Sequence, residues 1–463
     1  MKIAFCASEA VPFAKTGGLA DVTGALPLAL EELGHEVILI MPCYKQVRDA
    51  KAAIRRLKPD IVSSVIGEGV RAYFIEDDFY FGRESLYGDK TGDYKDNLKR
   101  FSYYCKRSID LLKELDFSPD IIHCHDWQSA LVPVYMKTLY SADPFYNAAR
   151  TVFTIHNIGY QGLFPREEFA DLGIDWKYFD VETLEFFGRI NLLKGGIVFS
   201  DIINTVSPTY SKEIQTSEFG FGLEGVLAKR RKRLFGVLNG LDYSIWDPGA
   251  DKIIASDYTA SDLRGKSEDK KQLQEICGLP LNKDVPLVGI VSRLAEQKGF
   301  DLLSQAMDVI CKMNLQIVIL GTGDAEYHKL LSGIAAKYPK VMSLHLKFDD
   351  VLAHKIYAGS DIFLMPSKYE PCGLGQLISL RYGTIPVVFK TGGLADTVTP
   401  KCGFIFQRYK KDDLINSLKD ALKAFSAKDK WNKLIASAMQ CDFSWEESAR
   451  KYARLYEEAG KVE

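Results

Sequence analysis

The 463-residue sequence lacks several patterns that would assign it at once to a common class of protein. It has no apolar run long enough to cross a membrane as a helix. Its nine cysteines are an odd set without a Cys-x-x-Cys pair, and we interpret them as reduced thiols of a cytosolic protein. Its formal net charge is −2, with acidic and basic residues mixed along the chain, which argues against a dedicated nucleic-acid or membrane-surface protein.

What the sequence does contain is a regular alternation of short apolar runs and longer helical patterns, with 47 % apolar residues overall. Strands that alternate with helices predict parallel sheets covered by helices on both faces. In the first half, strands are predicted at Ile3–Ala7, Val37–Met41, Ile121–His123, Thr151–Ile155, Ile202–Val206 and Leu234–Leu238. In the second half, they are predicted at Leu287–Val291, Gln316–Leu320, Val341–Leu346, Ile362–Met365 and Pro386–Phe389.

A polar, charged stretch between residues 242 and 284, interrupted by prolines and glycines, marks a domain junction at its start. We therefore predict an α/β protein with two Rossmann-like, doubly wound domains, residues 1–243 and 244–440. Residues 441–463 contain an amphipathic helix. Polar residues and glycines collect after the predicted strands of both halves, where open α/β sheets bind ligands, so we expect the two domains to face a deep cleft.

The heptapeptide KTGGLAD occurs twice, at Lys15–Asp21 and at Lys390–Asp396. Each copy lies in a predicted strand–loop–helix unit, where paired glycines allow close approach of the backbone and a helix start favours phosphate. Two copies in equivalent places suggest that both domains approach one anionic ligand. A tight turn into a helix is the alternative for each copy, and the second copy has an equal claim to a purely structural role.

Several longer blocks now carry a resemblance. These are KTGGLADV, HCHDW, IHNIGYQG, LKGGIVFSDIINTVSPTY, VLNGLDYSIWDP, VSRLAEQKG, KYEPCGLGQL and TGGLADTV. In order and spacing the sequence resembles the bacterial glycogen synthase and plant starch synthase family over nearly its whole length. The resemblance implies the glycosyltransferase B fold and a C-terminal helix that returns to the first domain. It also implies transfer of glucose, with retention, from a nucleotide sugar, usually ADP-glucose, to the non-reducing end of an α-1,4-glucan.

The leaving nucleoside diphosphate develops negative charge that the enzyme must neutralise. Many glycosyltransferases use a metal held by Asp-x-Asp, a motif that this sequence lacks. We therefore expect no metal and no cofactor, with the cationic roles taken by Arg293, Lys298 and Lys15. Lys270 matches a lysine that the family also uses, although its charged surroundings equally suit a solvated helix.

Glu370 precedes Pro371, a residue suited to the first position of a helix, so the N–H groups of residues 372–374 are expected to point out of a helix start. The resemblance places Glu370 beside the donor sugar, as nucleophile or as positioning group, and we favour positioning. The remaining residues assigned to the donor are Gly17, Gly18, Asp21, Asn239, Phe348, Cys372, Gly373, Leu374 and Thr391.

The resemblance implies that His156 faces the donor glucose and acts with Glu370, Arg293 and Lys298 in catalysis. It places Tyr94, Asp126, Trp127 and Asn157 on the acceptor side. A zinc site at His123, Cys124 and His125 is an alternative for that block, since alternate strand residues share a face.

Two positions depart from the family pattern. Gly375 stands where a threonine or serine is usual, and Phe348 stands where a tyrosine often stacks on adenine. Both changes concern nucleotide binding, so UDP-glucose stays open as the donor. A non-catalytic glucan- or nucleotide-binding relative is the alternative function, but Lys15, His156, Arg293, Lys298 and Glu370 are all present. A phosphorolytic enzyme lacks support, because no pyridoxal-phosphate lysine block is found. We expect a cytoplasmic protein, or a plastid one if it is a processed plant form.

Overall fold

The computed structural model describes residues 1–50 and 52–462. The chain forms two compact units, Met1–Gly240 with Trp445–Glu463, and Leu241–Ser444. It passes from the first unit to the second after Gly240 and returns after Ser444. We call them the first and the second unit.

The first unit is built on a sheet with the strand order β14-β13-β9-β8-β1-β2-β5-β4-β3. The strands are β1 (Lys2–Cys6), β2 (Glu36–Pro42), β3 (Arg55–Lys58), β4 (Ile61–Ile66), β5 (Val70–Ile75), β8 (Ile121–His125), β9 (Arg150–Ile155), β13 (Ile202–Thr205) and β14 (Leu234–Gly236). From β14 to β5 all neighbours are parallel, whereas β4 and β3 complete the edge antiparallel. The predicted parallel sheet is thus extended at one side by an antiparallel pair of strands. β3 and β4 follow each other through a short turn and need no crossover helix.

Helices cover this sheet, and short hairpins lie beside it. The helices are α1 (Gly18–Glu32), α2 (Lys45–Asp49), α3 (Asp78–Phe81), α4 (Asn97–Glu114), α5 (Asp126–Ser129), α6 (Leu131–Lys137), α7 (Leu192–Phe199), α8 (Pro208–Glu213), α9 (Glu224–Lys229) and α18 (Trp445–Gly460). The small strands are β6 (Gly88–Asp89), β7 (Gly92–Asp93), β10 (Leu163–Pro165), β11 (Glu185–Phe186) and β12 (Arg189–Asn191). The 3-10 helices are η1 (Pro144–Tyr146), η2 (Arg166–Leu172), η3 (Trp176–Tyr178) and η4 (Arg231–Arg233).

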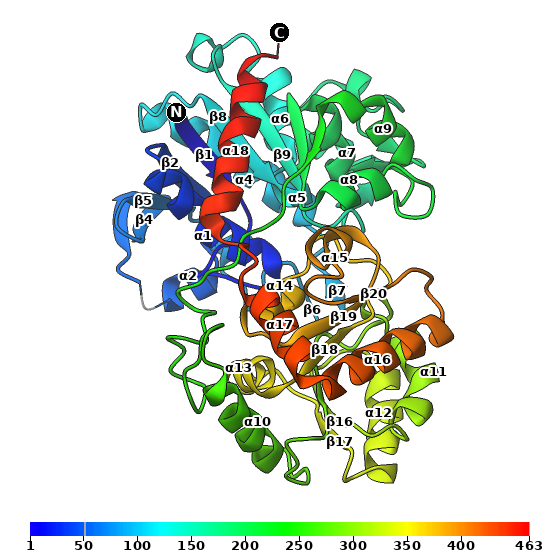
Figure 1. Cartoon of the computed structure of the whole chain (residues 1–463). Coiled ribbons are helices and arrows are strands. Elements are labelled where there is room, and N and C mark those ends of the chain that lie inside the picture. The colour runs from blue at the N-terminus through cyan, green and yellow to red at the C-terminus, as the bar shows by residue number, and fades with distance from the viewer. Residues whose placement is uncertain (51, 463) are drawn as a thin grey trace. The chain divides into compact units, whose positions relative to one another are not determined.

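The C-terminal helix α18 is part of the first unit and packs on α1 and β9 (Figure 1). Its apolar face, which includes Trp445, Tyr452, Leu455 and Tyr456, joins the core of that unit. Burying an apolar side chain of this size contributes about 1.5–3 kcal/mol. This repeating stripe, rather than helix propensity, therefore holds α18 on the sheet.

The second unit has a fully parallel sheet in the order β17-β16-β15-β18-β19-β20. Its strands are β15 (Leu287–Val291), β16 (Gln316–Leu320), β17 (Met342–His345), β18 (Ile362–Met365), β19 (Ile385–Phe389) and β20 (Phe404–Phe406). Numbered along the chain, this is the 3-2-1-4-5-6 order of the Rossmann fold. The parallel part of the first sheet follows the same rule from β5 to β14.

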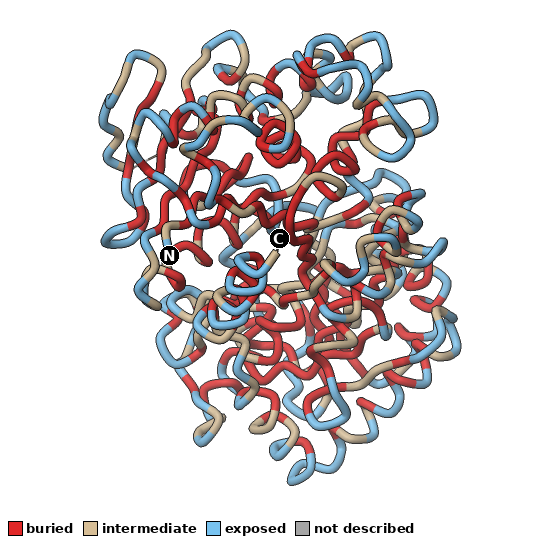
Figure 2. The backbone as a smooth tube through the Cα atoms, turned by 90° about the horizontal axis from the view of Figure 1, so that it is seen from above, coloured by how far each residue is buried: buried red, intermediate tan, exposed pale blue. Residues whose placement is uncertain are grey.

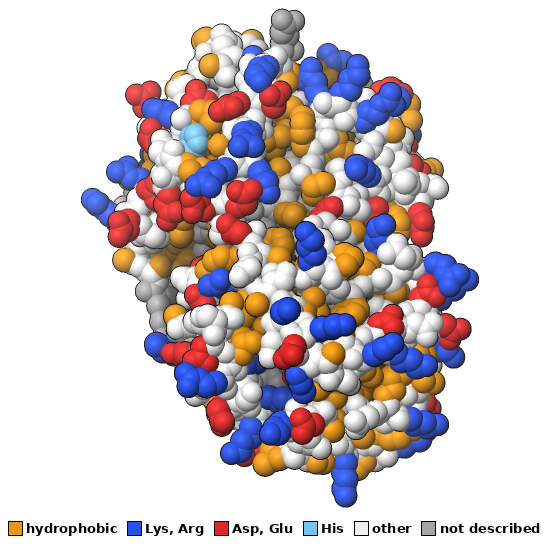
Figure 3. All heavy atoms as spheres, viewed as in Figure 1, with side chains coloured by type: hydrophobic (Ala, Val, Ile, Leu, Met, Phe, Trp, Pro, Cys, Tyr) orange, Lys and Arg blue, Asp and Glu red, His pale blue; other side chains and the backbone are white. Residues whose placement is uncertain are grey.

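Helices flank the second sheet as well. They are α10 (Arg264–Ile276), η5 (Glu296–Lys298), α11 (Phe300–Ile310), α12 (Ala325–Lys337), α13 (Asp350–Gly359), α14 (Gly375–Arg381), α15 (Gly392–Thr397), α16 (Lys411–Ser426) and α17 (Lys428–Met439). Within each unit the buried stretches of the chain lie inside and the exposed stretches lie at the periphery (Figure 2). Cationic and anionic side chains are interspersed on the face shown in Figure 3. Among residues 1–50 and 52–462, no helix is long and apolar enough to cross a membrane.

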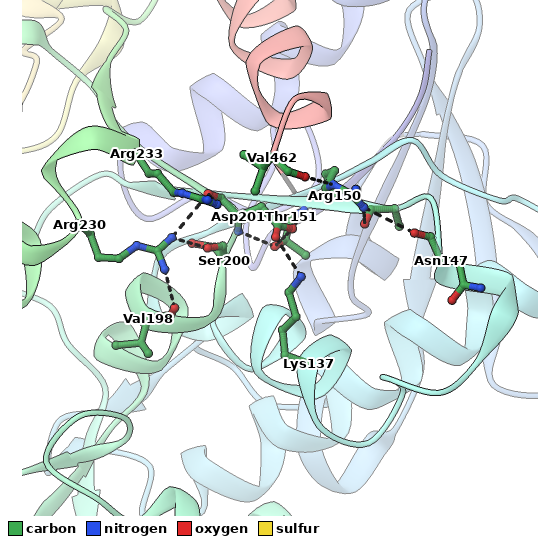
Figure 4. A network of polar contacts seen from close by, with 11 residues as sticks. Lys137, Asn147, Arg150, Thr151, Val198, Ser200, Asp201, Arg230, Arg233 and Val462 are labelled. Carbon is green, nitrogen blue, oxygen red and sulfur yellow. Dashed lines mark hydrogen bonds and ion pairs between the residues drawn. The ribbon is translucent and has the colours of Figure 1, made fainter.

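The amino ends of β9 and β13 are tied together by a polar network (Figure 4). The Asp201 carboxylate accepts hydrogen bonds from the main-chain N–H of Thr151 at 2.8 Å and from its hydroxyl at 2.9 Å, and pairs with Lys137 at 2.9 Å. Nearby, the Arg150 guanidinium donates to the carbonyl of Val462 at 3.2 Å, which fixes the chain after α18. Structural ion pairs thus lie at the amino ends of the strands, which we call the amino edge of the sheet. A different set of polar groups lies at the carboxyl ends of the strands, which we call the carboxyl edge.

Every strand predicted from the sequence is present, with ends displaced by at most two residues. In the two large sheets the predictions missed β5, β20 and the antiparallel pair β3 and β4, and they also missed the small strands β6, β7, β10, β11 and β12 outside these sheets. β3 is largely exposed and charged, so its sequence carries no apolar run.

Candidate active site

The strand order of the first unit reverses between β1 and β8, and ligands of open α/β sheets bind beside such a reversal at the carboxyl ends of the strands. Glu9 follows β1 and Asp126 follows β8, so these two residues flank the reversal. His156 follows the next strand, β9, and its main-chain N–H donates to Asp126 at 2.7 Å. The structure thus brings together residues that lie up to about 150 positions apart in the sequence.

The first KTGGLAD copy forms the loop between this edge and α1, and the buried Glu9 holds its backbone. One carboxylate oxygen of Glu9 accepts from the N–H of Thr16 at 2.5 Å and of Gly17 at 3.3 Å. The other accepts from the Thr16 hydroxyl at 2.6 Å. The loop conformation is therefore fixed from its inner side.

The outer side of the same loop is open. Lys15 is half exposed, and its ammonium pairs with Asp21 at 2.7 Å. A Cβ added at Gly17 or Gly18 would meet no atom within 4 Å. No packing contact among the described residues therefore requires these glycines.

His156 is held as a neutral imidazole in this edge. Its Nε2 lies 3.0 Å from Nδ1 of His125, the last residue of β8. Burial lowers the pKa of His156 to about 3 and holds the pKa of His125 well below its ordinary value. At neutral pH the ring therefore acts as a hydrogen-bonding group and not as a cation.

Asp126 adopts a positive φ of 55°, which aspartate tolerates better than most residues because of its short polar side chain. Burial raises the pKa of its carboxyl to about 7, against the opposing effect of hydrogen bonds from the main-chain N–H groups of His156 and Asn157. The nearby charge of Glu9 raises the pKa further. Asp126 therefore changes charge near neutral pH.

This raised pKa predicts how Asp126→Asn changes stability with pH. An unfolded aspartate has a pKa of about 3.9. Since the folded pKa is higher, the carboxyl favours folding most below pH 4, and this contribution is lost as pH rises to about 7. Asparagine keeps an oxygen for the two N–H groups but does not ionise. We expect urea unfolding at pH 5 and pH 8 to show the variant gaining stability relative to the wild type at the higher pH. A pH-independent difference would contradict the raised pKa.

Trp127 is buried rather than open to a ligand. Its ring packs edge-on against Phe101 at 4.9 Å between centroids. Gly162 has a φ of +63°, and a Cβ there would lie 2.7 Å from the Trp127 ring. The block that contains Gly162 and the block that contains Trp127 are therefore packed against each other.

Tyr94 is linked through Tyr87 to Glu9, which follows the carboxyl end of β1. Its ring lies under the guanidinium groups of Arg83 and Arg100, 4.6 and 5.1 Å from the centroid, and its N–H donates to the carbonyl of Tyr87 at 2.9 Å. The hydroxyl of Tyr87 in turn donates to Glu9 at 2.6 Å. The Tyr94 loop is thus anchored on the residue that also holds the first KTGGLAD loop.

Two asparagines complete the edge. Asn239 follows β14 and is buried, and among the described residues its side-chain oxygen has no hydrogen-bond partner. Asn157 accepts from the N–H of Gly159 at 3.0 Å and so shapes the turn after His156.

In the second unit the strand order reverses between β15 and β18, and a buried ion pair lies there. Lys298, in η5 after β15, donates to Oε2 of Glu370, after β18, at 2.6 Å. The Ser367 hydroxyl donates to the same oxygen at 3.0 Å. The side chains of Lys298 and Glu370 are 21 % and 6 % exposed, so both charges are largely shielded from water.

Arg293 lies beside this pair on the loop after β15. It is exposed, and its guanidinium donates to the Gln297 side chain at 3.1 Å. Gly299 has a φ of +81° and allows η5 to pack on the loop after β18, because a Cβ at Gly299 would lie 2.0 Å from the carbonyl oxygen of Pro366. The loops after β15 and β18 are therefore in van der Waals contact.

The second KTGGLAD copy differs from the first, since its glycines are packed. A Cβ at Gly392 would lie 1.9 Å from the carbonyl oxygen of Glu370, and one at Gly393 would lie 2.0 Å from that of Cys372. The N–H of Gly393 also donates to the Glu370 carbonyl at 3.1 Å. Thr391, the buried N-cap of α15, leads into this contact. These glycines support the Glu370 loop.

The predicted helix start at Pro371 is wrong. α14 begins at Gly375, with Leu374 as its N-cap, and spans only seven residues. Gly373 adopts a φ of +77°, which interrupts the backbone between the proline and the helix. Cys372, Gly373 and Leu374 therefore lie in a loop and not in the first turn of a helix.

The structure does not bring Lys270 together with these residues. Its ammonium is buried, pairs with Asp361 at 2.7 Å, and donates to the carbonyl oxygens of Lys283 and Val285. Asp361 precedes β18 and also accepts from the N–H of Leu287, so Lys270 lies at the amino edge of the sheet. The alternative, in which Lys270 is a solvated helix residue, is also wrong, because its side chain is buried.

Phe348, which follows β17, is 83 % exposed.

The zinc alternative finds no support in the geometry. His123 uses both ring nitrogens, one with the Tyr456 hydroxyl at 2.9 Å and one with that of Thr154 at 2.7 Å. Within residues 1–50 and 52–462, no group of three or more His, Cys, Asp or Glu side chains is placed to hold a metal ion.

Sequence reasoning gave no role to Glu9 or Ser367 and considered His125 only as a zinc ligand. In the structure these residues contact Gly17, Glu370 and His156 respectively. Glu9 and His125 were detectable as polar residues at the ends of strands. Ser367 had no such signal, because its role depends on the path of the loop after β18.

Two parallel-sheet units of the Rossmann type, each with its polar residues at the strand reversal, define a glycosyltransferase of the B fold. Residues 2–229 match the starch synthase catalytic domain, and residues 273–436 match the glycosyl transferases group 1. The chain belongs to the family of bacterial glycogen synthases and starch synthases, and it is a glycosyltransferase of glucan synthesis.

The relatives align with nearly the whole chain. It is 49 % identical over 475 residues to the glycogen synthase of Geotalea uraniireducens, with 98 % of each chain aligned. It is 46 % identical to that of Thermotoga maritima, with 99 % of each aligned. The catalytic domain of starch synthase IV from Arabidopsis thaliana, bound to ADP and acarbose, has a TM-score of 0.90 at 35 % identity over 99 % of both chains. Sucrose-phosphate synthase from Thermosynechococcus elongatus shares the fold, with a TM-score of 0.63 at 18 % identity.

Proposed function

We propose that the protein transfers glucose from ADP-glucose to the non-reducing end of an α-1,4-glucan, with retention of configuration and without a metal ion. The observation that carries the proposal is the shielded pair of Lys298 and Glu370 at the strand reversal of the second unit. A largely buried carboxylate beside a cation suits a reaction in which a sugar gains positive charge while a diphosphate departs with negative charge.

We assign binding of the donor diphosphate to cationic side chains. Lys298 and Arg293 neutralise the diphosphate, Arg293 by its two-pronged guanidinium and Lys298 as a point charge. The exposed ammonium of Lys15, in the first unit, is assigned to phosphate binding as well. The loop residues Cys372, Gly373, Leu374 and Thr391 offer main-chain groups near the sugar and phosphates. Phe348 offers an exposed ring for stacking on the base.

Glu370 is assigned to positioning and charge stabilisation. Two donors already hold one of its oxygens, Lys298 at 2.6 Å and Ser367 at 3.0 Å. A carboxylate fixed in this way stabilises an oxocarbenium-like sugar electrostatically without moving. His156 contributes a neutral hydrogen-bonding ring to the donor glucose.

The acceptor glucan is assigned to the first unit. Asp126, with its raised pKa, and Asn157 lie beside His156, and Tyr94 lies on the loop anchored by Tyr87 and Glu9. Such groups bind sugar hydroxyls. The Arabidopsis starch synthase IV domain, whose structure contains acarbose, supports an oligosaccharide ligand for this fold.

The donor nucleotide is tested directly. Purified protein, glycogen primer and radiolabelled ADP-glucose or UDP-glucose are compared for incorporation into glucan. We expect at least tenfold higher kcat/KM with ADP-glucose, equivalent to about 1.4 kcal/mol of discrimination. Preference for UDP-glucose would reassign the donor and leave the reaction class intact. No incorporation from either donor would reject the proposed transfer.

Activity is expected to persist in excess EDTA, because Lys298, Arg293 and Lys15 supply the positive charge that a metal would provide. The measurement is the initial rate with ADP-glucose and glycogen after prolonged incubation with chelator, with and without added Mg²⁺. A chelator-inactivated enzyme that Mg²⁺ restores would show that the cations alone do not suffice.

A further inference from the structure

The proposed donor contact of His156 depends on which of its ring nitrogens carries the proton. Its Nε2 faces Nδ1 of His125 at 3.0 Å, so one ring donates to the other and Nδ1 of His156 is left for a ligand. If His125 donates, His156 presents an N–H group. If His156 donates, it presents a bare lone pair.

The surroundings of His125 decide between these two arrangements. His125 is fully buried, and its Nε2 has no hydrogen-bond partner among the described residues. Its ring stacks on Phe5 at 5.3 Å, and its centroid is 4.1 Å from that of His123, whose own nitrogens are both engaged. A hydrogen on the buried Nε2 of His125 would be an N–H group without an acceptor, which folded proteins avoid more strictly than an unused lone pair.

We propose that His125 is a positioning residue that donates from Nδ1 and thereby holds His156 in the Nδ1–H tautomer. His156 then offers a hydrogen-bond donor to an oxygen of the bound sugar. This inference deepens the proposed function, because it specifies the chemistry that His156 brings to the donor site. His125 itself is fully buried, so it acts through His156.

The test uses the full-length protein with ¹⁵N-labelled histidine. Long-range ¹H–¹⁵N spectra report the tautomer of each neutral ring, and the His156→Asn variant identifies the His156 signals. We expect the Nδ1–H pattern for His156 in the wild type. In His125→Phe, which fills the space without a donor and offers only its ring face as a weak acceptor for an N–H group, we expect His156 to shift toward the Nε2–H form. His125→Asn, whose amide nitrogen can replace Nδ1 as donor, should keep the Nδ1–H form.

Kinetics provide the second readout. We expect His125→Phe to lower kcat about tenfold or more at saturating ADP-glucose, and His125→Asn to recover most of it. An Nε2–H pattern for His156 in the wild type, or one unchanged in His125→Phe, would overturn the proposal. Because the spectra need no turnover, they give their answer even if the protein does not transfer glucose. Failure of the proposed function is therefore separable from failure of this inference.

Discussion

Lys298→Ala is expected to lower turnover by about two to three orders of magnitude at saturating donor, as does the loss of one preorganised electrostatic donor elsewhere. The Lys298 ammonium lies 2.6 Å from Glu370 in a site with little access to water, where a charge acts more strongly than at the surface. If it stabilises the departing diphosphate, the loss appears in kcat and not only in the KM for the donor.

The same substitution leaves Glu370 without its cation, so stability must be measured in parallel. Removing one partner of a buried pair costs up to about 3–5 kcal/mol, and less here because Lys298 is 21 % exposed. Lys368→Ala is the matched control, since Lys368 lies on the Glu370 loop but pairs with the exposed Glu296 at 2.6 Å. The control should keep turnover within about twofold. A lower melting temperature with unchanged turnover in Lys298→Ala would make Lys298 a purely structural residue.

Site residues were predictable from the sequence where their position depends on nearby residues, and not where it depends on contacts with distant parts of the chain. Residues that follow buried strands, such as His156 and Asp126, were predictable because parallel strands end at one edge of the sheet. Glu370 was predicted within its loop, but the helix start at Pro371 was not correct. Local proline chemistry allows that start, whereas the positive φ of Gly373 and the packing of Gly392 on Glu370 impose a longer loop.

The position of Lys270, by contrast, could not be predicted from its local sequence. Its sequence context, a run of charges on an amphipathic helix, suits a surface residue or a ligand contact equally well. Asp361, which binds it, lies 91 positions later in the chain, and only the folded sheet brings the two together. Ion pairs of this kind at the amino edge, like that of Asp201, cannot be inferred from local patterns.

The two KTGGLAD copies are expected to differ in how the same substitution affects stability. Gly18→Ala should leave the melting temperature unchanged, because the added Cβ meets no atom within 4 Å, yet lower activity if a ligand approaches that backbone. Gly393→Ala should lower both, because its Cβ would lie 2.0 Å from the carbonyl oxygen of Cys372. Overpacking of this kind costs about 1–3 kcal/mol.

The lysines of the two copies should show the matching asymmetry. Lys15→Ala should lower kcat/KM for the donor about a hundredfold, since its ammonium is assigned to the phosphates and, among the described residues, pairs only with the partly exposed Asp21. Lys390→Ala should stay within about twofold, as for an ordinary surface residue. Kinetics and thermal unfolding of Lys15→Ala, Lys390→Ala, Gly18→Ala and Gly393→Ala measure all four effects. Equal losses of activity at Lys15 and Lys390, or a destabilised Gly18→Ala protein, would show that the two copies do not divide ligand binding and loop support between them.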